Sequence, residues 1–107
     1  MTTFDKREDA FEKQFVHDEE LKFKAEARRN KMLGLWVAGK LGKGGDDAQT
    51  YAREVVTEEI DGAGDKGVVG KVMRDLAAKG VALSEDELRT RMDELMAAAV
   101  AQIKAGV

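Results

Sequence analysis

The fold of this chain is decided first by the stretch Leu83-Ser84-Glu85-Asp86-Glu87-Leu88. The Ser84 hydroxyl can accept a hydrogen bond from the Glu87 N–H while the Glu87 carboxylate reaches back, which makes a capping box at a helix start. Leu83 and Leu88 occupy the two positions of a hydrophobic staple. The apolar residues that follow recur at helical spacing: Leu88, Met92, Leu95, Met96, Ala99 and Ile103. This pattern predicts a helix with one face in a core.

A shorter helix is predicted immediately upstream, starting near Asp65. Gly80 suits the left-handed position that follows a helix end, and Val81 can close back on Leu76. The apolar positions of this helix are Val69, Val72, Met73 and Leu76. Residues 65–105 are therefore expected to form a helical hairpin.

A further helix is expected from Asp46 or Asp47, both good N-cap residues, to Ile60. Glycine-rich joints at residues 42–45 and 62–64 separate it from its neighbours. Its apolar stripe is Ala48, Tyr51, Ala52, Val55, Val56 and Ile60. A helix this short must pack against others to be stable.

The first segment of the chain is unusually long. Neither proline nor glycine occurs before Gly34, so one continuous helix is expected from Thr3 to Lys40, about 55 Å long. The other helices reach about 30 Å and cannot cover it. Its later half has a core stripe, whereas its earlier half places Phe4, Phe11 and Phe15 on one face among charged residues. The core stripe consists of Leu21, Ala25, Met32, Leu33 and Trp36.

These patterns predict an all-α protein, a four-helix bundle with a long first helix whose N-terminal part projects or is disordered. We expect residues 1–18 to be a partner-binding segment and residues 19–107 to be the bundle. The chain has no proline or cysteine and a formal net charge of −3. It has no apolar run long enough to span a bilayer and no signal-peptide core at its start, which favours a cytoplasmic protein.

Two glycine patterns resemble nucleotide-binding motifs but lack their context. Residues 34–40 fit G-x-x-x-x-G-K, yet Leu41 stands where a Ser or Thr would hold magnesium, and no strand precedes them. Residues 62–67 fit G-x-G-x-x-G but follow a helix, and Asp65 would repel a pyrophosphate. A flexible helix connection is the preferred interpretation of that second pattern. We expect no cofactor and no metal site.

Catalysis is not expected from this sequence. His17 is the only histidine and Ser84, already used as a cap, is the only serine. No Ser-His or Cys-His nucleophile pair is therefore expected. His17 lies beside acidic residues, where it is a partner contact, a pH sensor or a solvated surface histidine.

A run of basic residues follows His17 along the first helix: Lys22, Lys24, Arg28, Arg29 and Lys31. Nucleic-acid binding is one interpretation of this run. The sequence pI of 5.2 and the lack of interleaved aromatic residues favour a solvated face or a docking stripe for an acidic protein surface. We predict a secondary docking role for Lys24, Arg28, Arg29 and Lys31.

The aromatic face of Phe4, Phe11 and Phe15 has two interpretations. It either folds back onto the bundle or is left for a partner. Each buried Phe contributes roughly 1.5–3 kcal/mol, so leaving three exposed is costly unless a partner covers them. An amphipathic charged segment with aromatic anchors is typical of helix-in-groove recognition.

The N-terminal block resembles a known family. It combines Phe4-Asp5, Arg7-Glu8, Phe11-Glu12, Phe15, His17-Asp18 and Glu20-Leu21 with the run from Phe23 to Lys31. The likeness continues at Gly34, Trp36, Ala38, Leu41-Gly42 and Tyr51-Ala52. This pattern is similar to the zeta subunit of the alphaproteobacterial F1FO-ATP synthase.

The resemblance implies a regulatory inhibitor of ATP hydrolysis that is not itself an enzyme. The N-terminal segment would enter the F1 sector at a catalytic α/β interface and block rotation in the hydrolytic direction. F1 α and β subunits would be the partners, with the central stalk as a further contact, and the protein would be cytoplasmic and peripheral to the inner membrane. The inserting residues would be Phe4, Asp5, Arg7, Glu8, Phe11, Glu12, Phe15 and His17. The alternative hypothesis, from the residues alone, is a basic-helix adaptor or nucleic-acid-binding protein.

Overall fold

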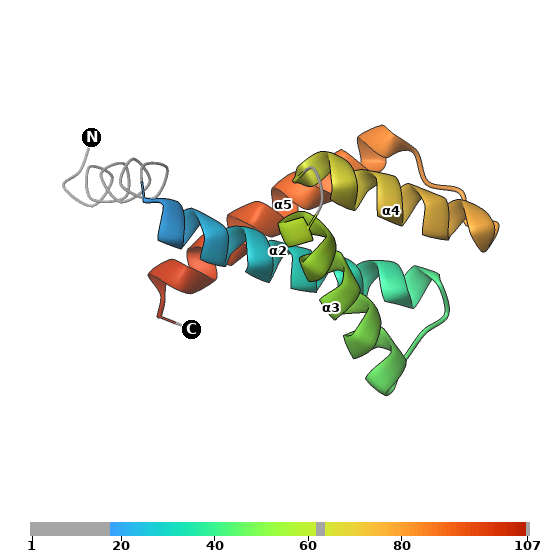
Figure 1. The fold of residues 1–107 in the computed structure, drawn as a ribbon, viewed down its shortest axis with the longest axis horizontal. Coiled ribbons are helices and arrows are strands. Elements are labelled where there is room, and N and C mark those ends of the chain that lie inside the picture. Colours follow the sequence, from blue (N-terminus) through green and yellow to red (C-terminus); the bar gives the residue numbers. More distant parts are fainter. Residues whose placement is uncertain (1–17, 62–63, 107) are drawn as a thin grey trace.

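The structure, a computed structural model, describes residues 18–61 and 64–106. This part of the chain contains four helices and no strand (Figure 1). The helices are α2 (Glu19–Lys40), α3 (Gly45–Asp61), α4 (Asp65–Ala78) and α5 (Glu85–Lys104). The predicted all-α, four-helix fold is confirmed.

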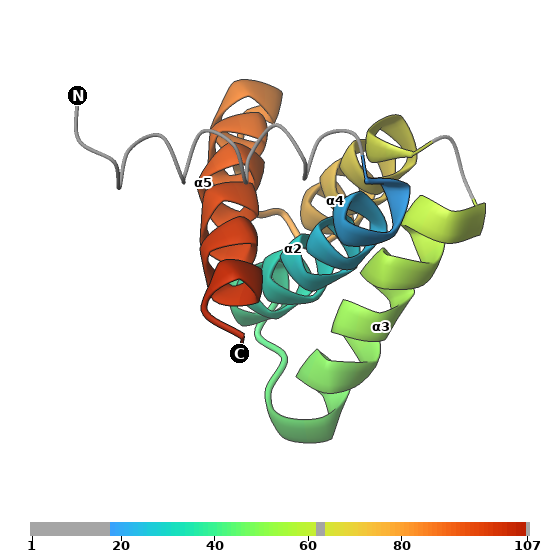
Figure 2. The ribbon, with the colours of Figure 1, turned by 90° about the vertical axis from the view of Figure 1, so that its left-hand side faces the viewer.

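Helix α2 is the centre of the bundle. It lies between α3 on one side and α5 on the other, and α4 packs against both α3 and α5 (Figures 1 and 2). None of the helices in the described ranges is both long and apolar enough to cross a bilayer. The contacts of α2 with all three other helices make it the element on which the fold depends.

The start of α2 corrects the prediction of one helix from Thr3 to Lys40. Asp18 has an extended backbone, with φ −98° and ψ 105°, and is the N-cap of a helix that begins at Glu19. Its Oδ1 accepts hydrogen bonds from the N–H groups of Glu20 at 3.0 Å and Leu21 at 3.2 Å. A short carboxylate that binds nearby backbone N–H groups favours a helix start over a helix interior, and this competes with helix continuation. The absence of Pro and Gly was not sufficient to predict a continuous helix.

The core lies between the four helices and is aliphatic rather than aromatic. Leu33, Leu76 and Leu88 are its largest fully buried apolar side chains. Val37, Val55, Val68 and Val72 are fully buried beside them, and Tyr51 and Met92 are nearly so. Trp36 is partly buried and packs on the edge of this cluster. Among the described residues, no phenylalanine belongs to the core.

Helices α2 and α3 approach so closely at one point that only glycine fits. A Cβ atom on Gly34 would lie 2.5 Å from the Cα atom of Ala52. Real Cβ atoms do not approach backbone that closely, so any larger residue at position 34 must move one helix away from the other. Gly34 therefore fixes where α2 and α3 cross.

The helix ends of the C-terminal hairpin follow the predicted signals. Gly80 has a φ of 72°, and the Val81 N–H donates to the Leu76 carbonyl at 2.9 Å, which closes the end of α4. The Glu87 N–H donates to the Ser84 hydroxyl oxygen at 3.0 Å, and that hydroxyl donates to the Glu87 carboxylate at 3.1 Å. The capping signal is confirmed, with the carboxylate turned to the hydroxyl of Ser84.

Candidate functional site

The predicted partner-binding segment joins the bundle at Asp18. Its residues Phe4, Asp5, Arg7, Glu8, Phe11, Glu12, Phe15 and His17 lie outside the described residues. Their role, and the division into residues 1–18 and 19–107, therefore stay predictions. Among the described residues, the candidate surface is formed by the first half of α2, the end of α3 and the start of α4.

Two of the four residues with a predicted docking role, Lys24 and Lys31, are exposed on α2. Lys24 has an exposed side chain and forms an ion pair with Glu20, with Nζ and Oε1 3.4 Å apart. Lys31 is also exposed, whereas Arg28 is half-buried and takes part in an interaction within the chain. Exposed ion pairs of this kind contribute little to stability, so Lys24 can change partners at low cost.

Arg29 is not part of this exposed set, and the docking role predicted for it stays a prediction. Its side chain is only 5 % exposed. The guanidinium lies inward between α3 and α4, where two carboxylates meet it. The i, i+7 spacing of Lys22 and Arg29 indicated a shared face, but the acidic partners contributed by α3 and α4 determine where the guanidinium lies.

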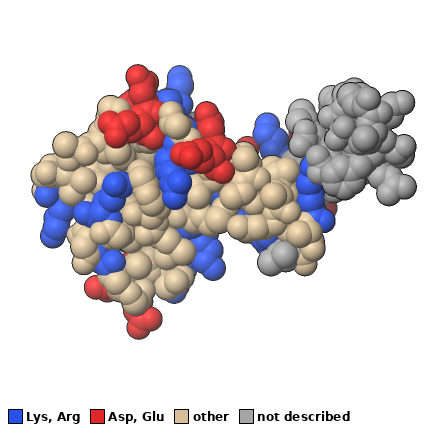
Figure 3. Space-filling view, turned by 180° about the vertical axis from the view of Figure 1, so that it is seen from behind, with Lys and Arg blue, Asp and Glu red and all other residues tan. Residues whose placement is uncertain are grey.

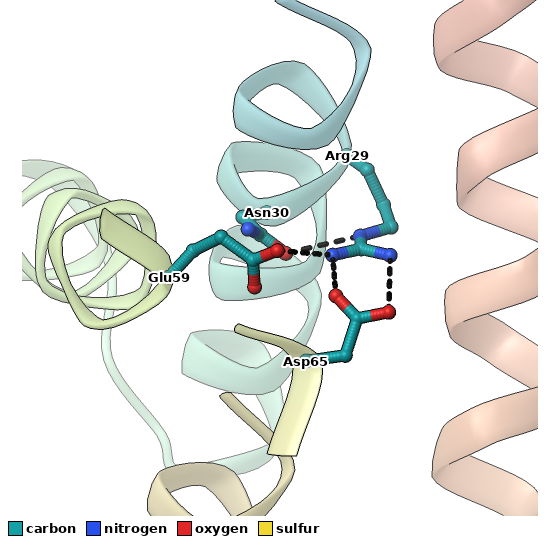
Figure 4. Close-up of polar contacts among 4 residues, drawn as sticks. All are labelled: Arg29, Asn30, Glu59 and Asp65. Atoms are coloured by element: carbon teal, nitrogen blue, oxygen red, sulfur yellow. Dashed lines mark hydrogen bonds and ion pairs between the residues drawn. The ribbon is translucent and has the colours of Figure 1, made fainter. Parts of the chain in front are cut away.

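Four side chains from three helices form what we call the Arg29 cluster: Arg29 and Asn30 from α2, Glu59 from α3 and Asp65 from α4 (Figure 4). Arg29 donates from Nη2 to Asp65 Oδ1 at 2.6 Å and from Nη1 to Asp65 Oδ2 at 3.4 Å. Its Nε donates to Asn30 Oδ1 at 3.0 Å. The bidentate pair is the strong form of Arg–carboxylate contact.

Glu59 is the second carboxylate of the Arg29 cluster and is less well satisfied. Its Oε1 lies 3.6 Å from Arg29 Nη2, beyond hydrogen-bond distance. Its Oε2 and Asn30 Nδ2 are buried without a hydrogen-bond partner. Burial, followed by the neighbouring carboxyl group of Asp65, raises the pKa of Glu59 to about 7. Burial alone would raise the pKa of Asp65 as well, but the hydrogen bond and charge of Arg29 outweigh it and lower that pKa.

An apolar hollow lies beside the Arg29 cluster. Phe23 of α2 is 52 % exposed and Ile60 of α3 is 58 % exposed, and both line this hollow together with Glu26 and Glu59. They are the exposed large hydrophobic residues among those described. Phe23 lies in the second turn of α2, a few residues after Asp18, so the hollow lies near the first described residue of the chain.

A second polar cluster joins α3 to α4 farther from the N-terminal segment. The Tyr51 hydroxyl donates to Asp75 Oδ2 at 2.8 Å, and Lys71 Nζ donates to the same oxygen at 3.1 Å. Lys71 also pairs with Glu54 at 3.5 Å and lies over the Tyr51 ring. Burial and the bond to Asp75 raise the pKa of Tyr51, so this tyrosine stays protonated and acts as a donor that fastens the two helices.

The glycine patterns do not form phosphate loops in the described chain. Residues 34–40 are helical throughout, as part of α2, and Gly34 packs against Ala52. Residues 64–67 of the second pattern lie at the start of α4, while Gly62 and Ala63 are outside the described residues. No group of three or more potential metal ligands occurs in the described ranges. On the face in Figure 3, acidic side chains gather mainly at the upper edge and basic ones are spread widely, so this face has no single basic patch.

Three features of this region were missed from the sequence. Asp18 could have been recognised as an N-cap by its position before Glu19 and Glu20, which suit the first turn of a helix. The sequence marks Asp65 as a helix start, yet nothing local indicates that it binds Arg29, 36 residues away. The exposure of Phe23 depends on how α2 and α3 pack, and no sequence period indicates it.

Comparison with known proteins identifies a family and a related solved structure. A family model described as ATPase inhibitor subunit zeta matches residues 1–102. A protein whose solution NMR structure is known is 48 % identical, with a TM-score of 0.70, and the match covers 81 % of this chain and 99 % of that chain. No protein with a curated description matches.

Proposed function

This chain belongs to the ATPase inhibitor subunit zeta family, and on that premise we propose that it regulates ATP synthase by suppressing ATP hydrolysis in the F1 sector. The family match supports an ATPase inhibitor role and an association with the ATP synthase complex. The proposed mechanism is the insertion of residues 1–18 at a catalytic α/β interface, where they block rotation. In this proposal the protein is a regulatory, non-catalytic subunit that reaches the membrane periphery through F1.

The composition of the core is the observation that carries the insertion mechanism. Three of the four phenylalanines are Phe4, Phe11 and Phe15, and the fourth, Phe23, is half exposed. The described core is closed by Leu, Val, Ala, Met and Tyr side chains. Aromatic side chains are frequent anchors of protein interfaces. An aromatic segment beside an aliphatic bundle supports a role for that segment in binding a partner.

The junction at Asp18 supports a division of labour between segment and bundle. Asp18 satisfies two N–H groups at the start of α2, so this helix does not need residues 1–17 to continue it. The bundle then docks outside F1 and holds the inserted segment in place. Lys24, Arg28 and Lys31 are the proposed secondary contacts with an acidic surface of F1, while Arg29 pairs with Glu59 and Asp65 within the bundle.

Deletion of residues 1–16 tests the mechanism directly. We expect the truncated chain to keep its helical circular dichroism and cooperative unfolding, because the described core lies in α2–α5. It should lose inhibition of ATP hydrolysis by the cognate F1. Undiminished inhibition by the folded, truncated chain would refute the insertion mechanism.

A pair of substitutions separates binding from folding. Phe11→Ala combined with Phe15→Ala should weaken inhibition and leave the melting temperature almost unchanged. Phe23→Ala is the matched control, because it removes a half-exposed ring that belongs to α2 rather than to the inserting segment. A large loss of stability in the double variant would mean instead that these rings pack in the bundle.

A further inference from the structure

The Arg29 cluster contains an imbalance of charge around a buried guanidinium. One guanidinium faces two carboxylates, and it donates both Nη hydrogen bonds to Asp65. Glu59, whose side chain is 12 % exposed, has only a 3.6 Å contact with the same cation. A buried carboxylate without full hydrogen bonding is costly, and binding a proton removes that cost.

A proton on Glu59 would also make its buried carboxyl group a hydrogen-bond donor. As a carboxylate, Glu59 can only accept, and its Oε2 is buried without a partner. When protonated, it can donate to the neighbouring carboxylate of Asp65, whose charge raises the pKa of Glu59. Asp65 would then hold both the guanidinium of Arg29 and the hydroxyl of Glu59.

We propose that Arg29, Glu59 and Asp65 form a proton-operated latch that holds the end of α3 and the start of α4 against α2. Glu59 lies in the last turn of α3, and Asp65 is the first residue of α4. The latch therefore lies at the joint between these two helices. With a proton on Glu59 the joint carries one negative charge beside one cation, and without it two negative charges compete for that cation.

Charged groups from all four helices surround the latch. Helix α2 contributes Arg29, which favours the ionised form of Glu59, and Glu26, which opposes it. Helix α4 contributes Asp65 beside Glu59, and Lys66 lines the same hollow as Glu59. From α5, the positive charge of Arg89 acts on Asp65 and favours its ionised form. Ionisation of Glu59 is opposed mainly by burial and by Asp65, both of which are supplied by the fold.

The direction of the pH effect follows from the two carboxyl groups. Glu59 has a folded-state pKa of about 7 against an ordinary value of 4.5, so the folded chain binds more protons than the unfolded chain between these values. Stability from this group is greatest below pH 4.5 and falls as the pH rises through 7. Asp65, with its lowered pKa, acts in the opposite sense, and its contribution is lost only in acid below its ordinary value of 3.8.

Titration of the full-length chain tests the latch. The side-chain carboxyl carbon of Glu59, followed by carbon-13 NMR, should titrate near pH 7. The equilibrium constant for unfolding in urea should rise about tenfold from pH 6 to pH 8. Glu59→Gln, a neutral side chain of the same shape, should remove this rise and unfold at pH 8 no more readily than at pH 6.

Two controls isolate the latch from other titrating groups. Glu58→Gln removes the neighbouring carboxylate of α3 and should keep the tenfold rise. His17 also titrates near neutrality, so each chain is compared with its His17→Gln counterpart. If Glu59 titrates with the ordinary glutamates near pH 4.5, or if Glu59→Gln keeps the pH dependence of the unmodified chain, the latch is refuted. The NMR titration uses the unmodified chain and therefore tests the latch even if Glu59→Gln fails to fold.

Discussion

Helix α2 is fastened to its neighbours in two opposite ways within a short length of helix. At Gly34 the contact with Ala52 is one of shape, with two backbones so close that no side chain fits between them. At Arg29, about one turn earlier, the contact with Glu59 and Asp65 is one of charge. The contribution of the first contact to stability does not depend on pH, whereas that of the second changes when Glu59 or Asp65 binds or releases a proton. Packing thus fixes the position of α2 against α3. The strength of its contact with the α3–α4 joint depends on pH.

The largest expected effect is at the charged contact. Arg29→Met should destabilise the chain by about 3 kcal/mol at pH 7, because it leaves two carboxylates without their cation. We take the lower end of the range for broken buried pairs, since the Asp65 side chain is 52 % exposed. Urea denaturation measures this loss. Lys31→Met, which removes an exposed cation two residues later, should change stability by less than about 0.5 kcal/mol. Equal effects of the two substitutions would show that the Arg29 cluster contributes no special stability.

The next effect is at the packed contact. Gly34→Ala should destabilise the chain by about 2 kcal/mol, because the added methyl group pushes against the backbone of Ala52. Gly39→Ala, in the same helix with no atom within 4 Å of the added methyl, should instead stabilise the chain by about 0.5 kcal/mol through helix propensity. Thermal melts of the two variants form a matched pair. Stabilisation by both would mean that α2 and α3 separate at no cost.

The smallest effect distinguishes the two contacts by pH. The cost of Arg29→Met should grow by about 1 kcal/mol from pH 6 to pH 8, because the cation lowers the pKa of Glu59 and its loss makes ionisation harder. The cost of Gly34→Ala should be the same at both pH values. Urea titrations at the two pH values give both numbers. A pH-dependent cost at Gly34 would show that the packed contact and the charged contact are coupled.

Local signals were enough to predict most of the fold. The capping box at Ser84 and the left-handed glycine at position 80 depend on residues a few positions apart, and both are found as expected. The apolar stripes predicted that Leu33, Val72, Leu76 and Leu88 would be buried, and they are. Such features can be recognised because the interacting groups are neighbours in the sequence.

Contacts between distant residues could not be predicted in the same way. From the sequence, the basic run on α2 is expected to be exposed along its length. Arg29 points inward instead, because Glu59 of α3 and Asp65 of α4 pair with it. The positions of α3 and α4 depend on the whole fold, so this pairing could not be predicted locally. The sequence patterns that include Gly34 did not indicate a helix contact, because its fit against Ala52 depends on the crossing of α2 and α3. The candidate site was predicted in its N-terminal half, which stays a prediction, while the latch and the apolar hollow were not foreseen.

The N-cap at Asp18 has a consequence for how this protein can vary. Because the first turn of α2 obtains its hydrogen bonds from a side chain at position 18, the register of the helix is set at that point. Upstream residues can be exchanged without rotating Leu33 or Val37 out of the core. A different peptide fused at Asp18 would therefore precede an unchanged helical bundle. N-terminal segments of different binding specificity can thus be compared on the same bundle.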